Sequence, residues 1–172
     1  MSEYKRAFLP GGSYFFTVVT HGRRPWLTEE PAIERLRQAF RHVMKDRPFV
    51  MDAVVVLPDH LHCIWQLPEG DEDFPERWRQ IKRFVSVGLK SSLNARNEKT
   101  LWQRRYWEHL LRNEKDWQRH IDYIHYNPVK HGYASHPADW PHSSFRRAMA
   151  QGWYDASWGE QEPAAIGRME FE

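Results

Sequence analysis

The chain has 172 residues, a net charge of +2 and a single cysteine, Cys63. This length suits one domain, and a lone thiol excludes an internal disulfide and any metal site that needs paired cysteines. The longest uncharged run, 8–22, is interrupted by a proline and two glycines, so the sequence predicts neither a membrane span nor a secretory leader. We therefore expect a protein of a reducing cytoplasm that binds no membrane.

Hydrophobic periodicity and turn signals predict the order of the elements. Alternating β-branched and aromatic residues indicate strands, and apolar residues at helical spacing indicate helices. Thr28 is a candidate cap of the first helix, and a Pro-Asp turn joins two strands into a hairpin. In chain order we expect strand 13–21, helix 28–46, strands 49–57 and 60–67, helix 74–93, strand 103–112 and a helix that begins after 113.

This order predicts an α+β protein with a ferredoxin-like, RRM-like antiparallel sheet. The pattern is β-α-β-β-α-β plus an appended helix, with helices packed on one face of the sheet. Fold alone says little about function. We expect one domain over 1–150, followed by an acidic, loosely ordered tail over 151–172, because 155–172 holds five acidic side chains and one basic one.

Basic side chains gather between residues 77 and 105, where nine Lys and Arg stand against Glu98. Aromatic residues such as Trp78 lie among them, and this mixture is typical of grooves that bind single-stranded nucleic acid. A solvated helix face is the alternative interpretation. One hypothesis is that the acidic tail folds over this groove and competes with DNA; a frayed terminus is the other.

Two histidines begin the predicted strand 60–67. Side-chain alternation places His60 and His62 on one face of the strand, and Leu61 and Cys63 on the other. Two imidazoles at this spacing point toward one spot and suit a single metal ion. Two solvent-facing histidines are the alternative.

The last predicted helix carries a tyrosine and an amide on one face. At about 100° per residue, Tyr123 and Asn127 lie one turn apart, beside His120. Pro128 disfavours helical geometry at Asn127, so we expect the helix to end there. The amide oxygen of Asn127 is then a candidate third metal ligand. A half-buried core tyrosine and a helix cap are the alternative.

Three segments in a characteristic order carry a family resemblance. They are VVLPDHLHCIW (55–65), WQRRYWEHLLR (102–112) and YIHYNPVKHG (123–132), and WPHSS follows at 140–144. Over about residues 4–144 the chain resembles the REP-associated tyrosine transposases. These are single-domain relatives of the HUH single-strand transposases of insertion sequences, the IS200-like family.

The resemblance implies that Tyr123 is the nucleophile and that His60 and His62 bind a divalent metal ion. Asn127 stands where related insertion-sequence enzymes carry a glutamine ligand, and this shorter amide departs from their pattern. The implied activity is nicking and rejoining of single-stranded DNA beside hairpins of repetitive extragenic palindromes, through a 5′-phosphotyrosine intermediate. The implied location is the bacterial cytoplasm and nucleoid. Tyr126, on a different helix face, is the rival nucleophile.

The choice of metal rests on two opposing arguments. Two imidazoles and an amide suit zinc by ligand type, whereas phosphoryl transfer with open coordination positions suits Mg²⁺ or Mn²⁺. The family uses the latter pair, which we expect here. His120 is a candidate for assisting protonation. The candidate DNA contacts, from phosphate-binding cations and a stacking ring, are Lys5, Arg6, Arg79, Lys82, Arg83, Trp102, Arg104 and Arg105.

Two other functions fit the same residues. One is a non-catalytic protein that binds REP hairpins, and the other is a metal-dependent hydrolase that uses an activated water. Insertion-sequence relatives exchange helices between subunits. This branch carries extra carboxy-terminal sequence that can complete a site in one chain, so we expect a monomer, with a dimer as the alternative.

Overall fold

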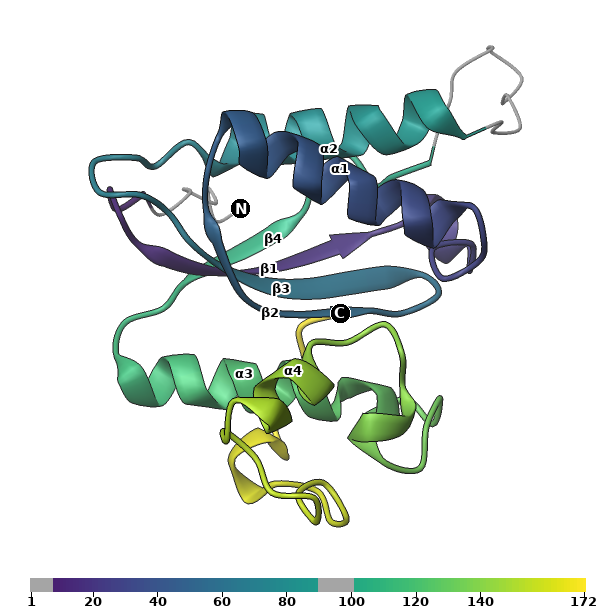
Figure 1. Ribbon diagram of the computed structural model, residues 1–172, viewed down its shortest axis with the longest axis vertical. Helices are drawn as coiled ribbons and strands as arrows, with labels where there is room; N and C mark the ends of the chain where they lie inside the picture. Colours follow the sequence, from purple (N-terminus) through teal and green to yellow (C-terminus); the bar gives the residue numbers. More distant parts are fainter. Residues whose placement is uncertain (1–7, 90–100) are drawn as a thin grey trace, which may run out of the picture.

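The computed structural model describes residues 8–89 and 101–172. Its centre is a four-stranded sheet in the order β2-β3-β1-β4, in which every neighbouring pair of strands is antiparallel (Figure 1). The predicted α+β fold with an antiparallel sheet is confirmed. The strands are β1 (Ser13–Val19), β2 (Val50–Val56), β3 (His60–Gln66) and β4 (Trp107–Leu110).

Helices cover both faces of the sheet (Figure 1). The helices α1 (Ala32–Asp46) and α2 (Phe74–Gly88) pack together on one face, as expected. The appended helix α3 (Glu114–Lys130) lies on the opposite face, with the short α4 (Phe145–Ala150) beside it. Three 3-10 turns complete the elements: η1 (His21–Arg23), η2 (Pro137–Asp139) and η3 (Ala164–Ile166). Within the described ranges, no helix is long and apolar enough to cross a membrane.

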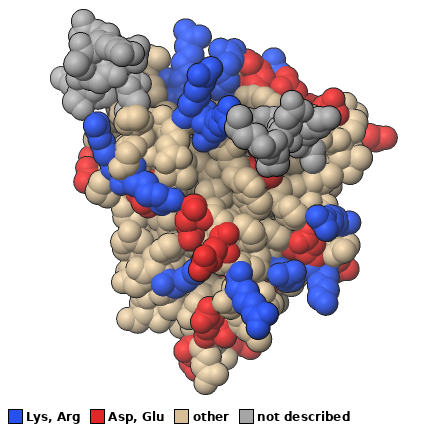
Figure 2. All heavy atoms as spheres, turned by 180° about the vertical axis from the view of Figure 1, so that it is seen from behind, with Lys and Arg blue, Asp and Glu red and all other residues tan. Residues whose placement is uncertain are grey.

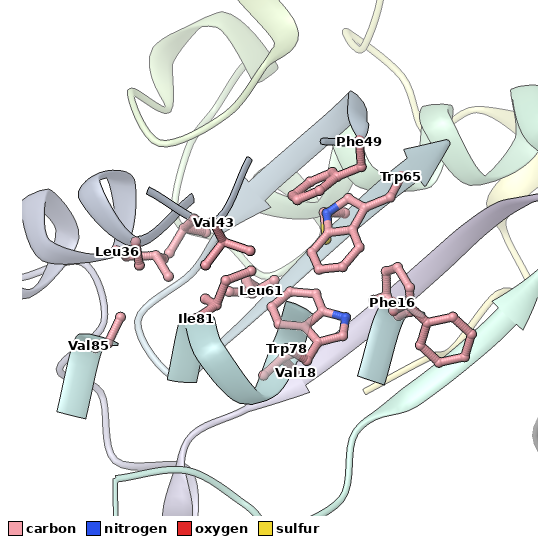
Figure 3. Packing of buried hydrophobic residues seen from close by; sticks show 14 of the residues in the cluster. Phe16, Val18, Leu36, Val43, Phe49, Leu61, Trp65, Trp78, Ile81 and Val85 are labelled. Atoms are coloured by element: carbon pink, nitrogen blue, oxygen red, sulfur yellow. The ribbon is translucent and has the colours of Figure 1, made fainter. Parts of the chain in front are cut away.

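Alternation along the central strands gives the sheet two apolar faces and two cores. Leu61, Cys63 and Trp65 of β3 point toward α1 and α2, where the rings of Trp65 and Trp78 stack with centroids 4.3 Å apart (Figure 3). The alternate residues of the same strand, such as Ile64, point to the other face and pack against α3. Because successive side chains of a strand point to opposite faces, His60 and His62 necessarily lie on the α3 side.

Two residues of the predicted basic and aromatic stripe belong to the core instead. Arg77 and Trp78 are each 1% exposed. The Arg77 guanidinium donates to the Asp71 carboxylate at 2.8 and 3.0 Å and to the backbone carbonyls of Arg47, Pro48 and Asp73. Charge counting along the sequence could not separate this structural cation from exposed ones, because the carbonyls that it binds lie mostly outside its own helix.

We expect Arg77→Leu to lower the free energy of unfolding by about 3 kcal/mol, because it leaves several carbonyl groups and Asp71 without their donor. Urea-induced unfolding measures this change. Arg79→Leu is the matched control on the same helix. Arg79 is exposed and, within the described ranges, pairs with Glu76 alone, so its loss should change the free energy of unfolding far less than the loss of Arg77. Equal effects of the two substitutions would contradict the structural role of Arg77.

Three helix boundaries differ from the predicted ones, two of them at prolines. The helix expected over 74–93 ends at Gly88, because Leu89 already has extended geometry. The first helix begins at Ala32 rather than just after Thr28, because the residue before Pro31 is disfavoured in helical geometry. The predicted end of α3 near Asn127 is wrong, since the helix continues through Pro128 to Lys130. A proline removes one backbone donor, but the next turn still closes: the amide of His131 donates to the Asn127 carbonyl at 3.0 Å.

The expectation of a loosely ordered tail over 151–172 also differs from the structure. Tyr154, Ile166 and Met169 are buried in the core beneath α3, with exposures of 8%, 2% and 5%. The acidic composition alone predicted a loosely ordered tail and gave no weight to these three apolar residues. Their burial holds the segment 151–172 against α3. From there the chain runs up beside α3 and ends below the sheet (Figure 1). The tail therefore lies on the α3 side, away from α2.

A chain of buried hydrogen bonds ties α3, α4 and the tail into one layer. His125 is fully buried, with Nε2 2.8 Å from the Ser144 hydroxyl and Nδ1 3.1 Å from the Tyr154 hydroxyl. The Tyr154 hydroxyl donates to the Asp122 carboxylate at 2.7 Å. These polar groups satisfy one another inside the second core, which fixes the rotation of α3 and hence the direction of its other side chains.

Candidate active site

Four predicted site residues meet in the space between β3 and α3. His60 is 2% exposed, and His62, Tyr123 and Asn127 are fully buried. The two imidazole centroids are 4.9 Å apart, and the Tyr123 ring lies 5.3 Å from that of His62. The histidines are therefore not the solvent-facing pair of the alternative interpretation. The fold brings residues 60 and 123 together because α3 crosses the face of the sheet on which both histidines lie.

Each histidine is oriented by a second polar residue. Nδ1 of His60 lies 2.7 Å from the Asp59 carboxylate, which can only accept, so Nδ1 donates. Nδ1 of His62 lies 2.9 Å from the hydroxyl of Thr17, its partner in the β1–β3 register. With these contacts made through Nδ1, each ring presents Nε2 to the site. Sequence reasoning missed Asp59 and Thr17, although Asp59 adjoins His60 and the pairing of strands predicts a neighbour for His62.

The donor atoms in this space fit a divalent cation. Nε2 of His60, Nε2 of His62 and Oδ1 of Asn127 are buried and have no hydrogen-bond partner among the described residues. Burial lowers the pKa of both imidazoles, that of His62 to about 4, so both rings are neutral at pH 7, which is the form that binds metals. Two ring nitrogens and an amide oxygen are thus available as ligands.

A residue that the sequence did not indicate, Glu172, reaches the same space from the tail. Its carboxylate accepts a hydrogen bond from the Tyr123 phenol. Its other neighbours are His131 (3.0 Å), Asn127 (3.3 Å), His62 (3.5 Å) and Lys130 (3.8 Å). Burial alone raises the pKa of Glu172, but the hydrogen bonds from His131, Tyr123 and Asn127, together with the nearby His62 imidazole, outweigh burial and lower it, so the group is ionised. It lies within 4.8 Å of a ligand atom of both His60 and His62.

The two candidate tyrosines have different surroundings. Burial, followed by the hydrogen bond to Glu172, raises the pKa of Tyr123, so its phenol keeps its proton in this arrangement. The Lys130 ammonium lies 4.9 Å from the centre of its ring. Tyr126 instead packs edge-on against Trp158 of the tail, with centroids 6.4 Å apart. The geometry thus favours Tyr123 over its rival.

His120, the candidate for assisting protonation, is 4% exposed and lies one turn before Tyr123. Its Nδ1 is 2.7 Å from the Asp116 carbonyl, which makes Nδ1 a donor and leaves Nε2 as the acceptor. That Nε2 atom is buried and has no hydrogen-bond partner in the described part of the chain. Burial lowers the pKa of His120, so the ring is neutral at pH 7.

A groove of about 640 Å³ adjoins the histidine and tyrosine site. It runs along β1 and β4 and is lined by Thr17, Arg23, Arg105, Trp107 and Phe171, among others. Arg105 is therefore placed beside the site. Arg104 is exposed in the same segment. Trp102 is half-buried with its ring against that of Trp26, and its backbone forms an isolated antiparallel β-bridge with Thr20.

The remaining predicted DNA contacts lie elsewhere. Arg79 and Arg83 are exposed on α2, on the opposite face of the sheet from the histidines, and Lys82 on the same helix donates to the Gln103 carbonyl at 3.1 Å. Figure 2 shows Lys and Arg side chains gathered at the end of the molecule formed by α1 and α2. Lys5 and Arg6 lie outside the described residues. The structure thus divides the predicted stripe between two faces.

A ferredoxin-like sheet with a histidine pair facing a helix-borne tyrosine defines a single-strand transposase of the HUH class. The chain matches the family model described as "Transposase IS200 like" over residues 10–127. It is 49% identical over 158 residues to the REP-associated tyrosine transposase of Escherichia coli (strain K12). The alignment covers 92% of this chain and 91% of the relative. A solved structure of a REP-associated tyrosine transposase bound to a REP hairpin aligns with a TM-score of 0.81 and 45% identity over 99% of both chains.

The chain therefore belongs to the IS200-like transposase family, in the branch of the REP-associated tyrosine transposases. The resemblance drawn from its three motifs is confirmed. The protein is an enzyme of the tyrosine transposase class, which cleaves and rejoins DNA. The IS200-like family depends on metal ions.

Proposed function

We propose that this protein nicks and rejoins single-stranded DNA beside REP hairpins, with Tyr123 as the nucleophile. One observation carries the proposal: the Tyr123 phenol is buried next to ring nitrogens of His60 and His62 that have no hydrogen-bond partner among the described residues. The similar structure with a REP hairpin supports hairpin DNA as the substrate.

The residues that would hold Mg²⁺ or Mn²⁺ are His60 and His62, through Nε2, and Asn127, through Oδ1. When bound, such an ion polarises the scissile phosphate and offsets the charge that develops on it. Asp59 and Thr17 keep the two rings in position for this role.

The reaction follows from the chemistry of a phenol and a phosphodiester. The Tyr123 oxygen attacks phosphorus and gives up its phenol proton, the bond from phosphorus to the DNA 3′-oxygen breaks, and the leaving oxygen takes up a proton, so that the step as a whole moves one proton from the phenol to the 3′-oxygen. The product is a 5′-phosphotyrosine link and a free 3′-hydroxyl, and the bond energy is retained, so a later 3′-hydroxyl reseals the strand. The Lys130 ammonium, 4.9 Å from the ring centre, stabilises negative charge on the phenol oxygen.

A covalent adduct tests this function. The protein is incubated with Mg²⁺ or Mn²⁺ and end-labelled REP hairpins with single-stranded flanks, and the products are separated on a denaturing gel. We expect a labelled band shifted by about the mass of the protein, 20.7 kDa. Cleavage without an adduct would instead indicate the hydrolase, and tight binding with neither product would indicate a hairpin-binding protein.

We further propose that the enzyme acts as a monomer in the bacterial cytoplasm and nucleoid. In support, one chain supplies both histidines, the tyrosine and the asparagine, and residues 151–172 complete the layer that holds them. On this basis residues 1–150 form the catalytic domain and the tail is its accessory segment. A mass measurement in solution should give a single-chain species.

We propose that Glu172 competes with the DNA phosphate for the site. Glu172→Gln removes the negative charge that pairs with Lys130 and His131, so we expect single-turnover cleavage at saturating metal to become about tenfold faster. The exposed Glu160→Gln, in the same tail but outside the groove, is the matched control and should leave the rate unchanged. A fall in rate on Glu172→Gln would instead make this carboxylate a metal ligand.

A further inference from the structure

The Phe171 side chain fills an aromatic space beside Tyr123, which we call the Phe171 slot. The ring of Phe171 is within 13° of parallel to that of Trp107 and within 18° of parallel to that of His120, with centroids 5.0 and 5.2 Å apart. Two further rings close the slot: Phe15 is tilted against Phe171 at 5.4 Å between centroids, and Tyr123 meets it edge-on at 5.1 Å. Phe171 itself is only partly buried. The slot is therefore built from both the sheet and α3.

The two tail residues together have the form of a nucleotide. Phe171 supplies a flat ring in the slot, and the adjoining Glu172 supplies an anion among His62, Tyr123 and Lys130. A nucleotide likewise consists of a flat ring, the base, next to an anion, the phosphate. Beyond the ring, the groove lined by Arg105 and Trp107 provides space for more of a strand.

We propose that the Phe171 slot binds the nucleobase next to the scissile phosphate, with the near-parallel rings of Trp107 and His120 as its stacking surfaces. Phe171 and Glu172 occupy this position until DNA displaces them. The inference rests on the proposed function, because it places the scissile phosphate at the histidines and Tyr123.

Binding of modified DNA tests the slot independently of cleavage. In a Tyr123→Phe background, which keeps the ring but cannot form an adduct, fluorescence anisotropy measures the affinity of REP hairpins in which each flanking nucleotide is replaced in turn by an abasic site. Stacking of one base on an aromatic residue is worth about tenfold in affinity. We expect one flanking position at which the abasic site weakens binding about tenfold.

Trp107→Leu should reduce the loss of affinity caused by the abasic site to less than about twofold. The control Trp153→Leu, at an exposed tryptophan outside the groove, should keep the full loss of about tenfold. Phe171→Ala, which removes only a partly buried ring, should tighten binding of the intact hairpin and not of the abasic one. The inference is overturned if the penalty at every position survives Trp107→Leu, or if Phe171→Ala leaves the affinity unchanged. If the wild type forms the adduct but the abasic-site penalty does not depend on Trp107, the slot alone is rejected. If the penalty depends on Trp107 but no adduct forms, the slot is supported and the proposed chemistry is rejected.

Discussion

Replacing Tyr123 by phenylalanine is expected to abolish the covalent protein–DNA adduct and to slow strand cleavage by about 10⁴-fold or more. The substitution removes only the phenol oxygen. The ring keeps its packing against His62 at 5.3 Å and against Phe15 at 6.1 Å, so the fold and DNA binding should persist. Single-turnover assays with labelled hairpins measure the rate, and anisotropy measures binding.

Tyr126→Phe is the matched control, because it removes the same atom from the neighbouring tyrosine of the same helix. Tyr126 lies against the tail, so this variant should form the adduct at the rate of the wild type. An adduct that survives Tyr123→Phe and disappears in Tyr126→Phe would transfer the nucleophilic role to Tyr126. Unchanged cleavage in both variants would indicate attack by water.

His62→Ala is expected to remove metal-dependent cleavage and to lower the affinity for Mn²⁺ by at least about 100-fold, because it deletes one of two ring ligands. Binding of Mn²⁺ by isothermal titration, without DNA, provides a readout that does not depend on activity. Asp59→Asn should weaken Mn²⁺ binding by a smaller factor, about 10-fold, since it disturbs the orientation of His60 but leaves both ligands in place.

His42→Ala is the control for histidine loss. His42 is exposed on α1, on the opposite face of the sheet, and should affect neither metal binding nor cleavage. If His62→Ala retained full Mn²⁺ affinity, the histidine pair would not be the metal site, and the cluster of His109, Asp116 and His120 would be the next place to examine.

The parts of the site that the sequence predicted are those governed by local periodicity. The two-residue repeat of a strand is enough to place His60 and His62 on one face, and the helical repeat is enough to align Tyr123 with Asn127. Glu172 and Phe171 could not be predicted this way. They reach the site through a return of the chain nearly fifty residues after Tyr123, and nothing in an acidic tail indicates that its last apolar side chains are buried.

The basic stripe shows a second limit of the sequence pattern. A run of cations indicates charge but not direction, and here Arg77 faces backbone carbonyls, Arg79 and Arg83 face solvent on α2, and Arg105 faces the groove. The packing of α2 against the sheet decides the directions of Arg77, Arg79 and Arg83, and the position of residue 105 beside β4 decides that of Arg105. The error at Pro128 has a similar origin, since tertiary contacts of α3 offset the cost of a proline within the helix.

The sheet separates two apolar cores, and the site lies at the edge of one of them, where the sheet meets α3. His60 and His62 are held by the backbone of a central strand, whereas Tyr123 belongs to the layer of α3, α4 and the tail. Layers with their own cores open as separate cooperative units, as amide exchange typically reveals. We therefore expect amide exchange to show α3 opening before β3, a partial opening that separates Tyr123 from the histidines while the sheet stays folded.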